Sequence, residues 1–114
     1  MATKTIFLKI VDREIPAKIV YEDDQALAFH DITPVAPTHV LIIPKKPIDQ
    51  IENMKKEDAP LFGHLMWVAT EVARKLNLTD GYRLVMNNGV GAGQSVFHVH
   101  LHLMAGRGFD WPPG

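Results

Sequence analysis

The sequence predicts an α+β fold in which two helices cover a five-stranded, largely antiparallel sheet. Three observations support this fold class. Short β-rich segments follow one another through tight turns, which favours antiparallel neighbours. Two other segments repeat their apolar residues at the helical period. The chain has 114 residues, the length of one domain, so we expect a single domain over residues 1–114 with an extended tail over residues 106–114.

The first segments predict a helix followed by a hairpin. Thr3 is a suitable cap for a helix over residues 4–12, whose apolar residues form one stripe. Pro16 ends that segment. Residues 17–22 and 25–30 then read as two strands joined by an acidic turn.

The middle of the chain predicts a loop, a central strand and a polar stretch. Pro34 and Pro37 interrupt the backbone in a loop. The β-branched, apolar run over residues 39–43 predicts a central strand that ends at Pro44. Residues 45–57 are polar, and we expect them to be solvated surface.

The second half predicts one long helix and two more strands. A helix opens near Asp58 and keeps its apolar residues at the 3.6-residue period to about residue 77. A strand over residues 82–86, a loop over residues 87–95 and a strand over residues 96–104 follow.

Composition narrows the class of protein. Hydrophobic residues make up 46% of the chain and charged residues 22%, as in ordinary globular domains. The chain has no cysteine, which excludes disulfides and cysteine nucleophiles and suits a cytoplasmic location. Its net charge of −1 lacks the basic excess of duplex-binding proteins, and its longest aliphatic run, residues 40–43, cannot span a bilayer. We therefore expect neither nucleic acid nor membrane as a partner.

The most informative segment is the run His98-Val99-His100-Leu101-His102-Leu103-Met104. Successive side chains of a strand point to opposite faces, so the three histidines share one face and the apolar residues share the other. Buried imidazoles need polar partners. We therefore expect the histidine face to look into a polar pocket or into water.

Two chemistries fit this row of histidines. Two of them and His39 could hold zinc, because strand residues two apart have Cα atoms about 6.6 Å apart. Alternatively, a neutral imidazole could attack phosphorus. His100, with a histidine on each side, is then the best-placed nucleophile, and a flanking histidine or His39 would protonate a departing amine. A row of surface histidines without a function remains as a third interpretation.

The loop before this row, residues 87–95, is rich in glycine. It matches neither a Walker A loop nor the dinucleotide fingerprint, because no Gly-Lys-Ser/Thr follows and it leads into a strand. Its backbone N–H groups and the Ser95 hydroxyl could converge on a phosphate without a bound metal. We therefore expect a phosphate site and no cofactor.

A second group of candidate residues ends the predicted strand over residues 25–30. Asp31 could accept hydrogen bonds from two ribose hydroxyls, although it could also simply cap the turn. Phe29 and Ile32 could cover a base. His64 lies near the apolar face of the second helix, and we interpret it as structural.

Residues 98–104 fit the pattern His-φ-His-φ-His-φ-φ, where φ is apolar, which is the signature of the histidine triad superfamily. The chain resembles the Hint branch, the histidine triad nucleotide-binding proteins, over nearly its whole length. The segments that carry this resemblance are Ile6-Phe7, Arg13-Glu14-Ile15-Pro16, Phe29-His30-Asp31-Ile32, Ala36-Pro37-Thr38-His39, Ile43-Pro44-Lys45-Lys46, Gly93-Gln94-Ser95 and Trp111-Pro112-Pro113-Gly114.

The resemblance implies a homodimer whose two sheets join into one ten-stranded sheet. It also implies a purine nucleoside phosphoramidase, which acts on AMP or GMP linked through nitrogen to an amine such as lysine. His100 would attack the α-phosphorus and form a nucleotidyl-histidine, which water hydrolyses. His102 would contact the phosphate region, and His98 and His39 would support the other histidines.

The resemblance assigns further contacts residue by residue. The phosphate and ribose contacts would be Asn87, Gly93, Gln94 and Ser95, the nucleoside contacts Asp31 and Ile32, and Trp111 would reach toward the partner's site. No residue is assigned to a metal. The alternative function is a regulatory or interaction module that binds purine nucleotides and hydrolyses them only incidentally.

Overall fold

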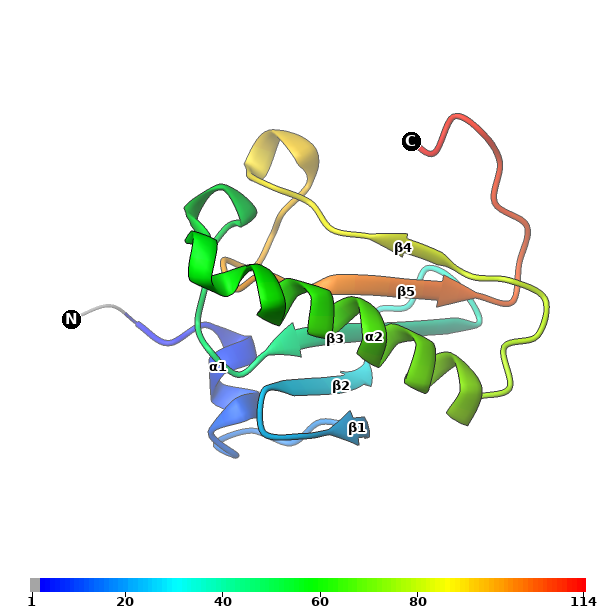
Figure 1. The fold of residues 1–114 in the computed structure, drawn as a ribbon. Helices are drawn as coiled ribbons and strands as arrows, with labels where there is room; N and C mark the ends of the chain where they lie inside the picture. Colours follow the sequence, from blue (N-terminus) through cyan, green and yellow to red (C-terminus); the bar gives the residue numbers. More distant parts are fainter. Residues whose placement is uncertain (1–2) are drawn as a thin grey trace.

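Five antiparallel strands form the centre of the structure, a computed structural model that describes residues 3–114 (Figure 1). Their order across the sheet is β1-β2-β3-β5-β4, and every neighbouring pair is antiparallel. The α+β fold class is therefore confirmed. The strands are β1 (Ile19–Glu22), β2 (Ala26–His30), β3 (Thr38–Pro44), β4 (Arg83–Val85) and β5 (Leu101–Ala105). The helices are α1 (Ile6–Val11) and α2 (Ala59–Lys75), with single 3₁₀ turns η1 (Ile51–Asn53), η2 (Lys56–Asp58) and η3 (Val90–Ala92).

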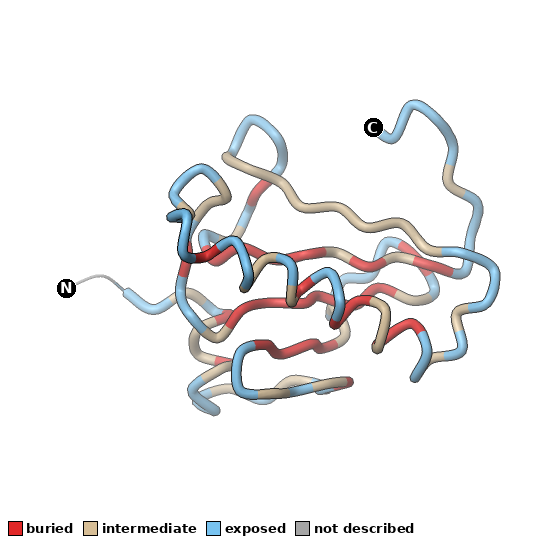
Figure 2. Tube along the Cα trace, in the orientation of Figure 1, coloured by how far each residue is buried: buried red, intermediate tan, exposed pale blue. Residues whose placement is uncertain are grey.

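The sheet separates two hydrophobic cores because its apolar residues alternate along the strands. Ala26, Ala28, Val40 and Ile42 point to the face covered by α2. Their neighbours along β2 and β3, together with Phe7 and Ile10 of α1, form the core of the opposite face. In Figure 2 the buried residues accordingly run in unbroken stretches along β2 and β3. Each helix thus covers a different face of the sheet.

Strand β5 lies inside the sheet, between β3 and β4. His102 is paired with Leu41 of β3 on one side and with Val85 of β4 on the other. Of the three histidines in the row, His102 is therefore held from both sides in the interior of the sheet.

The predicted first helix begins two residues later than expected. Thr5, and not Thr3, is its cap, because the Thr5 hydroxyl accepts a hydrogen bond from the backbone N–H of Leu8. The helix then begins at Ile6, and its buried residues are Phe7 and Ile10.

The last strand is shorter than predicted, since it begins at Leu101 and not at Val96. The chain bends over residues 96–98, and the N–H of Val99 donates outside the sheet, to the carbonyl of Ile48 at 2.8 Å. This contact also buries Ile48, so the segment over residues 45–57 is not surface throughout. His98 and His100 therefore precede the paired strand, and only His102 lies within it.

The long helix agrees with its prediction to within two residues at its end. Leu65, Val68 and Val72 are fully buried on its inner side. Among the described residues, no helix combines the length and hydrophobicity that crossing a bilayer would require.

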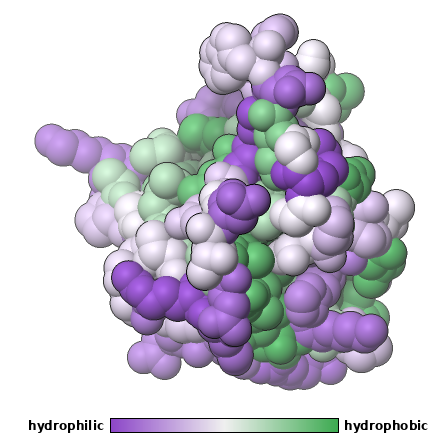
Figure 3. Space-filling view, turned by 90° about the vertical axis from the view of Figure 1, so that its right-hand side faces the viewer, coloured by the Kyte–Doolittle hydropathy of each residue, from purple (hydrophilic) through white to green (hydrophobic). Residues whose placement is uncertain are grey.

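Some large apolar side chains remain at the surface of the single chain, among them Ile32, Val35 and Trp111. Figure 3 views one end of the molecule, where hydrophobic groups reach the surface in patches separated by hydrophilic ones. The C-terminal tail turns away after β5 and runs beyond β4, one of the two edge strands of the sheet (Figure 1).

Candidate active site

A pocket of about 550 Å³ opens on the face of the sheet that carries α1. Its apolar wall includes Phe7 and Ile10 of α1 with Phe29 and Leu41 of the sheet. Its polar side is formed by His100, His102, Asp31 and Ser95. The pocket thus places two histidines of the row against a hydrophobic cavity. The expected polar surroundings are only half correct, because the ring of Phe7 meets that of His100 edge-on at 5.0 Å between centroids.

The backbone fixes the proton position on His100. Its Nδ1 lies 2.8 Å from the carbonyl oxygen of His98. A carbonyl can only accept, so Nδ1 carries the hydrogen and donates. In the neutral ring the lone pair is then on Nε2. His100 is 6% exposed and lines the pocket. It therefore offers a nucleophilic nitrogen in a mostly desolvated site.

A second hydrogen-bonded chain fixes the proton on His102. The N–H of Val35 donates to Nδ1 of His39 at 3.2 Å, so neutral His39 carries its hydrogen on Nε2. That nitrogen lies 2.9 Å from Nδ1 of His102 and donates to it. The remaining hydrogen of neutral His102 is on Nε2. His102 thus has a free N–H donor, complementary to the free lone pair of His100.

His98 is the most buried of the four histidines, at 1% exposure. Its Nε2–H donates to the carbonyl of Pro44 at 2.7 Å, across the end of β3. Its Nδ1 is buried without a hydrogen-bond partner. The His98 side chain does not line the pocket, so it acts by holding the backbone carbonyl that orients His100.

Burial keeps all four rings neutral near pH 7. Desolvation lowers the pKa values of His39, His98 and His100 below their ordinary 6.5. It lowers the pKa of His102 to about 4, with smaller contributions from His100 and His39. The site therefore combines one neutral imidazole acceptor with one neutral imidazole donor, an arrangement suited to attack on phosphorus.

Asp31 joins this cluster in two ways. One carboxylate oxygen accepts a hydrogen bond from the N–H of Thr33 at 2.8 Å, which caps the turn. The other lies 3.5 Å from Nε2 of His39 and lines the pocket with the rest of the residue. The turn-capping interpretation of Asp31 is therefore correct without excluding a ligand contact.

The same cluster is the place where a metal ion would be expected. Asp31, His39 and His102 each contribute a potential ligand atom, and these atoms lie within 4.8 Å of one another. The set differs from the predicted zinc site, which used two histidines of the row and His39. In this geometry the hydrogen bond between His39 and His102 already uses Nε2 of His39 and Nδ1 of His102. A metal would have to displace the proton between them.

The glycine-rich loop contributes less to the pocket than the sequence suggests. Ser95 lines the pocket, whereas Asn87, Gly93 and Gln94 do not. The Gln94 side chain is buried within the loop, where it accepts from the N–H of Gly89 and donates to the carbonyls of Asp49 and Val96. Gln94 therefore stabilises the loop, and its side chain is not free for a phosphate.

The remaining candidate residues lie in the pocket, on the exposed tail and on α2. Phe29 and Ile32 line the pocket, and their contact with a base stays a prediction. Trp111 is 84% exposed and does not line it. His64 lies on α2 and bonds to Asp23 at 2.6 Å, which agrees with a structural role.

Sequence reasoning missed the contribution of α1 to the pocket. Phe7 and Ile10 were expected only as part of an apolar stripe, and they form the wall beside His100. No sequence signal identifies them, because the side of the sheet on which a short helix packs depends on the whole fold.

Comparisons with known proteins agree with this arrangement. A family model for the HIT domain matches residues 12–109. An uncharacterised HIT-like protein of Synechocystis is 59% identical over 114 residues, covering 100% of both chains. A solved HIT family hydrolase from Legionella pneumophila has 48% identity and a TM-score of 0.93, covering 97% of this chain and 100% of its own. A histidine triad nucleotide-binding protein from Candida albicans has 34% identity and a TM-score of 0.82, covering 96% and 83%. Since these similarities extend over almost the entire chain, the protein belongs to the HIT family.

Proposed function

We propose that this protein is a purine nucleoside phosphoramidase of the Hint type, which hydrolyses the P–N bond of AMP or GMP joined to an amine such as lysine. The observation that carries the proposal is the free Nε2 lone pair of neutral His100, held in the pocket by the His98 carbonyl. The names of two similar proteins, a HIT family hydrolase and a histidine triad nucleotide-binding protein, support a hydrolase that binds nucleotides.

The first step forms a bond between Nε2 of His100 and the α-phosphorus while the P–N bond to the amine breaks. The amine leaves with the bonding electron pair and takes up one proton from solvent at the exposed rim of the pocket, where Ser95 lies. The new nucleotidyl-imidazolium keeps its Nδ1–H bonded to the His98 carbonyl, which stabilises the positive charge. Water then attacks phosphorus, releases the nucleotide and returns one proton to solvent.

His102 serves the phosphate in this scheme. Its free Nε2–H donates to a non-bridging oxygen as negative charge grows in the transition state. The hydrogen bond from His39 makes Nδ1 of His102 an acceptor, which favours the neutral ring over the imidazolium. His102 is therefore a donor to the phosphate, and not the acid that protonates the amine.

The apolar part of the pocket would hold the base. Phe7, Phe29 and Ile32 would contact its faces, and Asp31 would accept from the ribose hydroxyls. Most of this wall is hydrocarbon and does not read the hydrogen-bonding edge of a purine. We therefore propose that adenine and guanine nucleotides are both accepted.

We also propose a homodimer, joined through β4 into a ten-stranded sheet. β4 is one of the two edge strands of the sheet, the other being β1, and an open edge is usually paired or covered. Trp111 is exposed in the single chain, and its tail runs beyond this same edge (Figure 1). A second copy would bring Trp111 toward the partner's pocket. The lack of cysteine fits a cytoplasmic location for this dimer.

The test is release of free amine from an adenosine phosphoramidate by the wild type and by His100→Ala. We expect the variant to lose at least 10³-fold in rate, because its nucleophile is gone. His64→Ala removes a histidine outside the pocket and is the matched control, which should keep its rate. Equal activity of His100→Ala and wild type would refute the mechanism.

The alternative function, a regulatory module that binds purine nucleotides, makes a different prediction for the same samples. AMP would raise the melting temperature of the wild type, since a ligand stabilises the native state to which it binds. No amine would be released. Turnover that depends on His100 decides for the enzyme.

A further inference from the structure

We propose that Arg107, which lies outside the pocket, is a positioning residue that sets the tautomer of His102. The inference deepens the proposed function and rests on it only for the effect on catalysis. The proposal starts from the Arg107 guanidinium, whose Nε donates to the carbonyl of Val35 at 3.0 Å. Val35 belongs to the turn over residues 31–37, on the same end of the sheet as the polar side of the pocket.

The Val35 backbone connects Arg107 to the histidines. Its carbonyl is held by Arg107, while its N–H donates to Nδ1 of His39 at 3.2 Å. His39 in turn donates to Nδ1 of His102 at 2.9 Å. Each link in this series fixes which nitrogen of the next ring carries the hydrogen. The result is the Nε2–H of His102 that the pocket uses as a donor.

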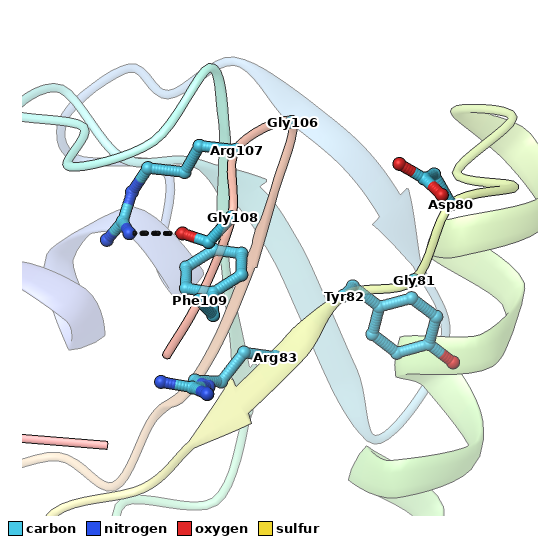
Figure 4. A pocket seen from close by; sticks show the side chains of 8 residues that line it. All are labelled: Asp80, Gly81, Tyr82, Arg83, Gly106, Arg107, Gly108 and Phe109. Atoms are coloured by element: carbon cyan, nitrogen blue, oxygen red, sulfur yellow. Dashed lines mark hydrogen bonds between the residues drawn. The ribbon is translucent and has the colours of Figure 1, made fainter. Parts of the chain in front are cut away.

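Arg107 is itself held in place, although it is exposed to solvent. Its guanidinium lies over the ring of Phe109 at 4.3 Å from the centroid, and that of Arg83 lies over the same ring at 5.1 Å. Figure 4 shows the ring of Phe109 between the two arginines, at a hollow lined by both. A further bond joins Nη1 of Arg107 to the carbonyl of Gly108 at 3.0 Å. These contacts aim the guanidinium at Val35.

A second contact holds the same turn from the neighbouring residue. Gly106 has φ +93°, and a Cβ placed there would come within 2.8 Å of Cβ of Pro37. The turn therefore packs directly against the backbone that follows β5. Two contacts therefore hold the turn against the end of β5. Gly106 packs closely on Pro37, and Arg107 donates a hydrogen bond to Val35.

Loss of the Arg107 hydrogen bond to Val35 would allow His39, and through it His102, to adopt the other neutral tautomer. Without the Val35 N–H on its Nδ1, His39 can carry its hydrogen there and present Nε2 as an acceptor. His102 then keeps a hydrogen on Nδ1 and turns a lone pair, in place of an N–H, toward the pocket. A phosphate oxygen would meet a lone pair where the transition state needs a donor.

The decisive measurement is the ¹⁵N chemical shifts of the His102 ring, which distinguish the two neutral tautomers, recorded by NMR on the full chain at pH 8. The wild type should show the Nε2–H form. Arg107→Met keeps an apolar stem on Phe109 and removes the donor, so its spectrum should show a substantial population of the Nδ1–H form. Arg83→Met removes the other guanidinium from the same ring without touching the turn, and should look like wild type.

Activity supplies the second readout. Amine release by Arg107→Met should fall on the order of tenfold, less than the loss from deleting a transition-state donor outright. Arg83→Met also loses the hydrogen bond from Nη2 of Arg83 to the carbonyl of Asp110 at 2.9 Å, so it is the control for the tautomer and not for the rate. Gly106→Ala disturbs the turn from its other support and should shift the tautomer in the same direction.

The outcomes separate this inference from the proposed function. If the wild type released no amine but Arg107→Met shifted the tautomer, the positioning would stand and the phosphoramidase proposal would fall. An unchanged His102 tautomer in a folded Arg107→Met protein overturns the inference, whatever the activity. If Arg107→Met fails to fold, Arg107→Leu also keeps an apolar side chain on Phe109 and lacks the donor to the Val35 carbonyl, and its unchanged spectrum would overturn the inference equally.

Discussion

At the scale of single residues, the backbone determines the chemistry of the histidines. The His98 carbonyl orients His100, and the Val35 N–H orients His39 and, through it, His102. The protein obtains an acceptor and a donor from two identical side chains because their Nδ1 atoms meet opposite partners. A neutral imidazole nucleophile follows from these bonds and from burial.

The pH dependence of the reaction tests this neutrality. Only neutral His100 can attack, and burial lowers its pKa below 6.5. We therefore expect kcat/KM to stay constant as the pH falls from 8 to about 6.5 and to decline only below that value. Amine release without enzyme must be subtracted at each pH. A midpoint above 6.5 would show that His100 is not held in its neutral form.

The row of histidines was the part of the site most accessible from sequence. Its alternation predicts one shared face for His98, His100 and His102 and singles out His100; His100 and His102 line the pocket together, whereas His98 does not. The backbone partners of these rings could not be predicted, because residue spacing places side chains and does not orient carbonyls. The role of Gln94 could not be predicted for the same reason. A glutamine that bonds to nearby backbone groups and a glutamine that binds phosphate look identical in the sequence.

At the scale of elements, one carboxylate connects the first hairpin to the long helix. One oxygen of Asp23 accepts from the N–H groups of Gln25 and Ala26 in the turn. The other accepts from the Tyr21 hydroxyl and from His64 of α2. Burial opposes ionisation of Asp23, but these hydrogen bonds outweigh it and lower its pKa to about 2.

Asp23→Ala should therefore lower the free energy of unfolding by about 2–3 kcal/mol, because it leaves several donors without a partner. Urea unfolding measures the change, and Asp24→Ala, at the exposed neighbouring position, is the control that should differ little from wild type. The Asp23 contribution is present above the unfolded pKa of about 3.9 and is lost as the pH falls toward 2. A loss shared equally by both variants would contradict this account.

Boundaries were the least predictable property of the elements. Burial alternates within β5, but residues 98–101 are all buried, and Val99 bonds to Ile48 and not to a neighbouring strand. Alternation reports which side chains are buried and does not identify the hydrogen-bonding partner. The position of the first helix cap was similarly ambiguous, since Thr3 and Thr5 both fit the preference.

At the scale of the whole molecule, the proposed dimer would pair β4, one of the two edge strands, and bring a second copy near the exposed tail. We expect sedimentation to give a dimer at micromolar concentration. Trp111→Ala should remain dimeric but bind AMP more weakly, because the tail would no longer reach the partner's pocket. A monomeric wild type at tens of micromolar would remove the basis for the ten-stranded sheet.

The division of the molecule by its sheet has a practical consequence. Within residues 3–114, the core beneath α2, around Leu65 and Val68, shares no side chain with the proposed catalytic pocket on the opposite face. Engineers can therefore repack that layer for heat resistance while leaving turnover intact. Substitutions in α1 would affect stability and the pocket together, because the helix packs on the sheet and also forms one wall of the pocket.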